Sequence, residues 1–97
     1  DEQSKAFVSA YEEKYGETPI QFAADAYDGM YIIKAAAEKA DITPDMDASA
    51  ICDALKAAMT EITYDGLTGS GMTWSADGEP NKEPKAVVIK DGAYTAM

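Results

Sequence analysis

The feature that most constrains the fold is an alanine-rich stretch between Phe22 and Ala40, in which apolar residues recur every three or four positions. This spacing places them along one side of an α-helix. Alanine favours helix formation and lets a neighbouring element approach closely. The stripe consists of Ala23, Ala26, Tyr27, Met30, Ile33, Ala37 and Ala40. Asp25 and Asp28 lie off the stripe, and we predict that they belong to a solvated helix face.

A shorter helix is predicted on each side of this stretch. Between Ser4 and Tyr15, bulky apolar residues recur at helical spacing, and Gly16 is a natural residue to end that helix in a left-handed cap. These residues are Phe7, Val8, Tyr11 and Tyr15. Thr43-Pro44 and Asp47 are both plausible starts for a third helix, with Thr or Asp as the N-cap. The apolar pattern of this helix runs from about Ala48 to Met59. Its apolar face comprises Ile51, Leu55, Ala58, Met59 and Ile62.

After the third helix, short β-rich runs are separated by turn residues. Met72 to Ser75 predicts a short strand, in which Trp74 is expected to pack against a helix. Ala86 to Lys90 predicts a second strand. Asp91-Gly92 is the dipeptide most favoured in a two-residue hairpin, so Ala93 to Met97 is expected to return as the partner strand.

The predicted order is therefore three helices followed by short strands, which places the chain in the α/β class. A chain of 97 residues is expected to have a thin core, since at this length only roughly 60–65% of the unfolded surface is buried. Three helices and one small β region do not close an obvious sandwich on their own. We therefore expect one edge of a larger α/β protein.

The net charge of −10 excludes several partners. Eight basic residues against eighteen acidic ones cannot form the positive footprint that nucleic acid binding requires. An anionic membrane surface is excluded for the same reason. No apolar run approaches the ~20 residues that are needed to span a bilayer. The acidic surplus is expected to serve solubility.

The sequence offers little chemistry for catalysis or metal binding. It has no histidine, so the Ser-His-Asp and Cys-His arrangements are absent. Cys52 is the only cysteine, and its place in a helical pattern predicts a buried structural thiol. Residues 66–71 match neither glycine-rich phosphate motif, and the acidic residues from 41 to 47 do not fit an EF-hand. We predict no catalytic residue, no metal and no cofactor; an enzyme that uses carboxylates alone is the least favoured function.

Several segments occur in a characteristic order, and the ordered set is more specific than any one of its members. They are Phe7 to Gly16, Pro19, Phe22 to Gly29, Ile51 to Leu55, Tyr64 to Gly69, Met72 to Gly78, Lys85 to Ile89 and Asp91-Gly92. In this order they resemble the C-terminal part of the type I periplasmic binding proteins, in the group of leucine/isoleucine/valine-binding and related amide-binding proteins. The resemblance extends over essentially the whole chain but covers only the last part of the family's usual length.

The resemblance implies two α/β lobes joined by a hinge, with residues 1–97 as a partial leucine-binding-protein-like domain and a hinge crossing near residues 85–90. Phe22 follows an extended Thr-Pro segment, a position that often lines a cleft, but the residues alone favour a core role for it. The resemblance implies that it contacts the side chain of the ligand. The family's polar groups for the ligand's charged ends lie in upstream segments, so residues 1–97 alone are expected to bind ligand poorly.

In function, the resemblance implies the solute-binding component of an ABC importer, which captures an amino acid or a similar small solute between its lobes and then docks on the permease. The implied location is the periplasm, or the cell surface for a lipid-anchored form. The alternative is a free-standing acidic protein-interaction domain, which would be a monomer that unfolds cooperatively. The importer hypothesis predicts instead that exposed apolar surface makes the isolated chain self-associate.

Overall fold

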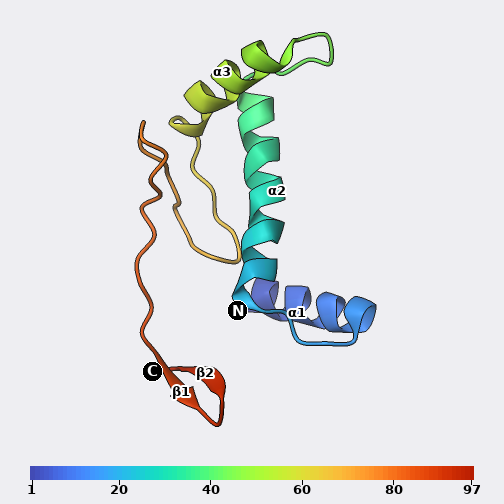
Figure 1. The fold of residues 1–97 in the computed structure, drawn as a ribbon, viewed down its shortest axis with the longest axis vertical. Coiled ribbons are helices and arrows are strands. Elements are labelled where there is room, and N and C mark those ends of the chain that lie inside the picture. The colour runs from blue at the N-terminus through green and yellow to red at the C-terminus, as the bar shows by residue number, and fades with distance from the viewer.

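The computed structural model describes residues 1–97. Figure 1 shows α1 (Glu2–Tyr15), α2 (Gln21–Lys39) and α3 (Ala48–Met59), followed by β1 (Val87–Lys90) and β2 (Ala93–Ala96). The predicted order of three helices and then short strands is confirmed, and the bounds of the third helix are those predicted. None of the helices is both long enough and apolar enough to cross a membrane.

Local capping fixes both ends of α1. The side chain of Asp1 accepts a hydrogen bond of 2.7 Å from the backbone N–H of Ser4, so the helix begins earlier than its apolar pattern indicates. Gly16 has a φ of 74° and closes the helix in the left-handed conformation, as predicted. Aromatic side chains then join α1 to α2, since the ring centroids of Phe7 and Tyr27 lie 5.0 Å apart.

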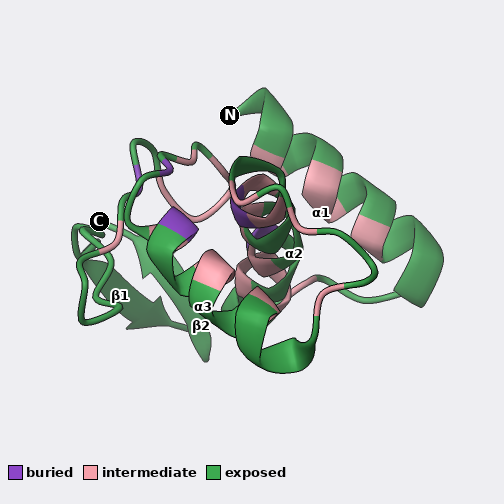
Figure 2. Cartoon of the chain, turned by 90° about the horizontal axis from the view of Figure 1, so that it is seen from above, coloured by how far each residue is buried: buried purple, intermediate pink, exposed green.

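The core lies where α2 and α3 cross. Ala36, Ala58 and Ile62 are its buried residues, and Figure 2 shows that burial is concentrated around these elements. The predicted apolar face of the third helix is confirmed, because Leu55 and Met59 also pack here. Trp74 packs against the same cluster, which confirms its predicted contact with a helix.

The predicted apolar stripe of α2 is wrong about which face is buried. Met30 and Ile33 are 70% and 56% exposed, whereas the neighbouring row of Asp28, Ile32 and Ala36 faces α3 and the loop that follows it. Periodicity identifies an apolar side of a helix, but the packing of distant segments decides which row is covered. Much of the stripe is therefore open in this chain.

The predicted strand from Met72 to Ser75 is also wrong, because this segment forms only two isolated bridges. Tyr64 and Met72 exchange two backbone hydrogen bonds of 2.9 Å, and Trp74 pairs with Pro80. A φ of 59° at Gly71 turns the chain immediately before Met72, so the pairing does not extend into a ladder. Met72 is nevertheless 1% exposed and fixes the loop to the helices.

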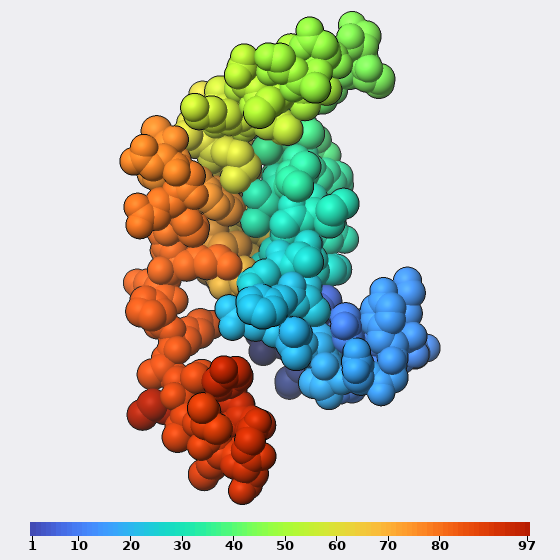
Figure 3. Space-filling model, viewed as in Figure 1, coloured from blue at the N-terminus to red at the C-terminus, as the bar shows by residue number.

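The C-terminal hairpin agrees with the prediction. Lys90 pairs with Ala93 and Val87 with Ala96, and the two turn residues Asp91 and Gly92 have φ values of 50° and 80°. Positive φ at both positions is the pattern of a type I′ turn. All residues of both strands are exposed. Figures 1 and 3 show the hairpin projecting at one end of the molecule, joined to the rest by an extended segment.

The molecule is elongated, with principal extents of 50 × 29 × 21 Å, and only five residues are buried. The thin core expected from the length is therefore present. The predicted burial of Cys52 is wrong, because its thiol is exposed. α3 packs through Leu55, Ala58 and Met59 in its second half, whereas Cys52 lies near the start of the helix, away from this contact.

Candidate functional site

Phe22 lies in the first turn of α2, just after an extended segment. Ile20 precedes the helix with φ −89° and ψ 172°, and no side chain caps the helix there. Phe22 is 74% exposed and Ile20 is 66% exposed. A core role for Phe22 within residues 1–97 is therefore excluded, and a large apolar side chain is displayed at this end of the helix.

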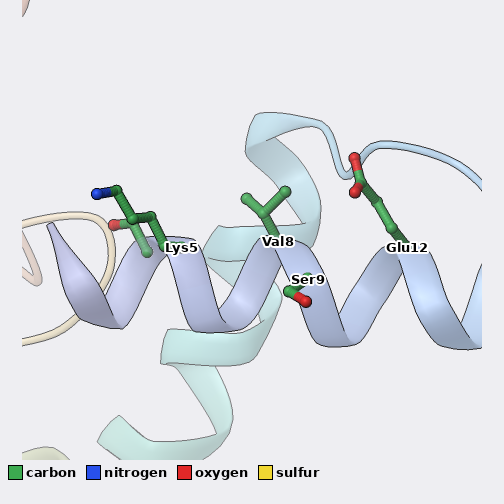
Figure 4. A pocket seen from close by; sticks show the side chains of 5 residues that line it. Lys5, Val8, Ser9 and Glu12 are labelled. Atoms are coloured by element: carbon green, nitrogen blue, oxygen red, sulfur yellow. The ribbon is translucent and has the colours of Figure 1, made fainter.

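Two surface depressions of the chain lie away from Phe22. Figure 4 shows a depression along one side of α1, where Val8 lies between Lys5 and Glu12. Its lining comes from a single helix, and no polar groups converge on a common point. A second depression lies over residues 73–75 and 79–81. Neither of these two depressions includes Phe22.

The most ordered polar arrangement surrounds Asp28, in the middle of α2. The side chain is 1% exposed. Its Oδ1 atom accepts a hydrogen bond of 3.0 Å from the backbone N–H of Leu67, and its Oδ2 atom accepts bonds of 2.8 and 2.7 Å from the N–H and hydroxyl of Thr68. The prediction of a solvated face is therefore wrong for Asp28. Its carboxylate instead holds the turn at residues 66–69 against the helix.

Gly66 makes this approach of the turn to α2 possible. A Cβ atom at this position would lie 2.5 Å from Cε2 of Tyr64 and 2.6 Å from Oδ1 of Asp28. Only a residue without a side chain fits between the ring and the carboxylate. Partial burial raises the pKa of Tyr64 above its usual value, and the negative charge of Asp28 raises it further.

Lys82 extends the arrangement to the segment that leads toward the hairpin. Its Nζ atom donates a hydrogen bond of 2.7 Å to the hydroxyl of Thr68 and lies 4.0 Å from Oδ1 of Asp25. Thr68 donates its own hydroxyl hydrogen to Asp28, so the hydroxyl oxygen is free to accept from Lys82. Asp25 and Asp28, one turn apart on α2, are therefore connected to a segment more than fifty positions away.

Sequence reasoning missed this polar arrangement. One signal was present: Asp28 continues the row of Ile32 and Ala36 at four-residue spacing, so it falls on the side of α2 that packs. Its partners, about forty residues further along the chain, carry no complementary charge that the sequence could have revealed. We call the contact of Asp28 with Leu67 and Thr68 a structural clasp, because both carboxylate oxygens of Asp28 already accept hydrogen bonds from the loop.

Comparison with known proteins shows which proteins this chain resembles. Residues 1–93 match the family described as periplasmic binding protein. A crystal structure of a candidate branched-chain amino acid ABC transporter from Rhodospirillum rubrum is 32% identical, with a TM-score of 0.66. That likeness covers 100% of this chain and 27% of the other, so the chain spans about a quarter of that protein. No curated protein matches the chain.

Proposed function

Because the chain belongs to the periplasmic binding protein family, we propose that it supplies part of the solute-binding component of an ABC importer, which captures a branched-chain amino acid or a related small solute. The family consists of transport components rather than enzymes. The likeness to a candidate branched-chain amino acid transporter supports this choice of solute class. Capture requires no covalent chemistry, so the function does not depend on the missing histidines.

Phe22 is the residue that we propose for contact with the solute. A large apolar side chain that is 74% exposed at the start of a helix is available to an aliphatic ligand. Such a contact contributes through burial of apolar surface, roughly 25 cal/mol for each square ångström removed from water. A branched aliphatic side chain therefore suits it better than a charged one.

We further propose that the extended link before β1 is a hinge crossing, overlapping the range near residues 85–90. Residues 83–85 form no hydrogen bond or ion pair, and Ala86 bonds only to Met97 of the hairpin. The hairpin itself contacts neither α2 nor α3. A link with these properties can change its backbone angles without breaking contacts, which is what lobe closure requires.

The partners and the location follow from the same proposal. A closed binding protein delivers its solute to a membrane permease, which would be the protein partner of the intact molecule. The family acts outside the cytoplasm. We propose that the intact protein is either free in the periplasm or anchored by a lipid at the cell surface, and cell fractionation would distinguish these two forms.

The test of the solute contact is the Phe22→Ala substitution in the intact protein that carries this segment, with L-leucine as the probe. We expect the dissociation constant to rise about tenfold or more, since the loss of about 1.5–3 kcal/mol of apolar contact corresponds to at least that factor. Isothermal titration calorimetry measures it. Met30→Ala is the matched control, because it shortens a large apolar side chain of the same helix two turns away from Phe22. Unchanged L-leucine affinity in Phe22→Ala would contradict the proposed contact.

A further inference from the structure

Lys82 is the last residue of the extended segment that is fixed to the helical part of the molecule. Asn81, immediately before it, forms three hydrogen bonds. Its backbone N–H donates to the carbonyl of Thr73, its Oδ1 atom accepts from the N–H of Thr73, and its Nδ2 atom donates to the carbonyl of Gly71. Lys82 then reaches Thr68 and Asp25. The three residues that follow form no hydrogen bond and no ion pair.

The bond from Lys82 to Thr68 is stronger than its partial exposure alone would indicate. An ammonium group donates to a hydroxyl at 2.7 Å, and that hydroxyl donates at 2.7 Å to the buried carboxylate of Asp28. When a hydroxyl group lies between an ammonium group and a carboxylate, its two hydrogen bonds polarise and so strengthen each other. The ion pair to Asp25 at 4.0 Å, with side chains 39% and 38% exposed, contributes less because it is at the limit of contact and partly solvated.

We propose that Lys82 is a latch that sets where the hinge link begins. While Lys82 is bound, backbone movement is confined to residues 83–86. When it is released, the link extends back through Lys82 to Asn81, which still has its own bonds to Thr73 and Gly71 but no longer has a fixed residue after it. Lys82 is thus a positioning residue for lobe movement. The role of Lys82 in lobe movement rests on the proposed function. Its bonds to Thr68 and Asp25 are present in the chain without ligand.

Hydrogen exchange of single amides by NMR, on the chain without ligand, tests the latch. In Lys82→Met the amides of Thr68, Thr73 and Asn81 should exchange about tenfold faster, because local opening no longer breaks a charged hydrogen bond. Lys85→Met is the matched control: it removes the same charge three residues further on, where no bond exists, and should leave these amides unchanged. Lys82→Arg should restore most of the protection.

Two results would overturn the latch. One is equal exchange at Thr68, Thr73 and Asn81 in Lys82→Met and in the unsubstituted chain. The other is an increase of the same size in the core amides of α2 and α3, since this would show general destabilisation instead of a local release. The calorimetric result for Phe22 does not affect either outcome, so failure of the latch and failure of the proposed solute contact are separate results.

Discussion

At the scale of single residues, Asp28 and Gly66 depend on each other. The carboxylate satisfies two backbone N–H groups and one hydroxyl of the turn, and this leaves no buried polar atom of its side chain without a partner. Burial of a charge costs free energy unless hydrogen bonds of this kind compensate for it. Gly66 keeps the space in which those bonds form. The absence of a side chain at Gly66 is therefore a condition for the hydrogen bonds of Asp28.

We predict that Gly66→Ala destabilises the chain by about 2 kcal/mol, because the added methyl group must displace the ring of Tyr64 or the carboxylate of Asp28. Gly29→Ala is the control on the helix side. No atom lies within 4 Å of a Cβ there, so this change should stabilise α2 by about 0.5–1 kcal/mol. Urea unfolding followed by circular dichroism measures both. A Gly66→Ala midpoint equal to that of the unsubstituted chain would contradict the crowding.

At the scale of elements, the sequence predicts best what local interactions decide. The helix caps and the Asp91-Gly92 turn depend on neighbours within a few residues. The structure has the Gly16 cap and the turn where they were predicted, and it has Asp47, one of the two predicted starts of the third helix, as the N-cap. The packed face of α2 depends on a loop about forty residues away, so its apolar pattern did not identify it. Cys52 was misplaced for the same reason, because only the docking of α3 decides which part of that helix is covered.

The hairpin of β1 and β2 packs against none of the helices. Two isolated strands are marginally stable in water, and here every strand residue is exposed. We predict that the amides of β1 and β2 exchange far faster than those of α2 near Ala36, which is 1% exposed. Hydrogen exchange followed by mass spectrometry measures this difference. Protection in the hairpin equal to that in α2 would show that its strands are stabilised by contacts absent from this structure.

At the scale of the whole molecule, exposed apolar surface is the dominant property. Phe22, Met30 and Ile33 lie along one side of α2 and are 74%, 70% and 56% exposed. A helix face of this kind normally packs against another element. The Rhodospirillum rubrum protein is nearly four times as long as the part that matches, so a complete family member has further chain with which to cover such a face.

We therefore expect residues 1–97 alone to self-associate, and Met30→Asp to shift the population toward monomer by placing a charge in the apolar stripe. Size-exclusion chromatography with light scattering gives the molar mass. Ser49→Asp is the control, because it adds the same charge at an exposed position on α3. A monomeric mass at all concentrations would favour a free-standing interaction domain instead.

The exposure of Cys52 has a consequence for the redox state of the protein. It is the only cysteine in residues 1–97, so it cannot form a disulfide bond within them. Outside the cytoplasm, where the family acts, conditions in bacteria favour oxidation of thiols to disulfides. An oxidant that accepts two electrons can then join two copies of residues 1–97 by a disulfide between their Cys52 sulfur atoms. Oxidant would produce such a dimer whether or not the apolar stripe is covered, and a reducing agent would separate it.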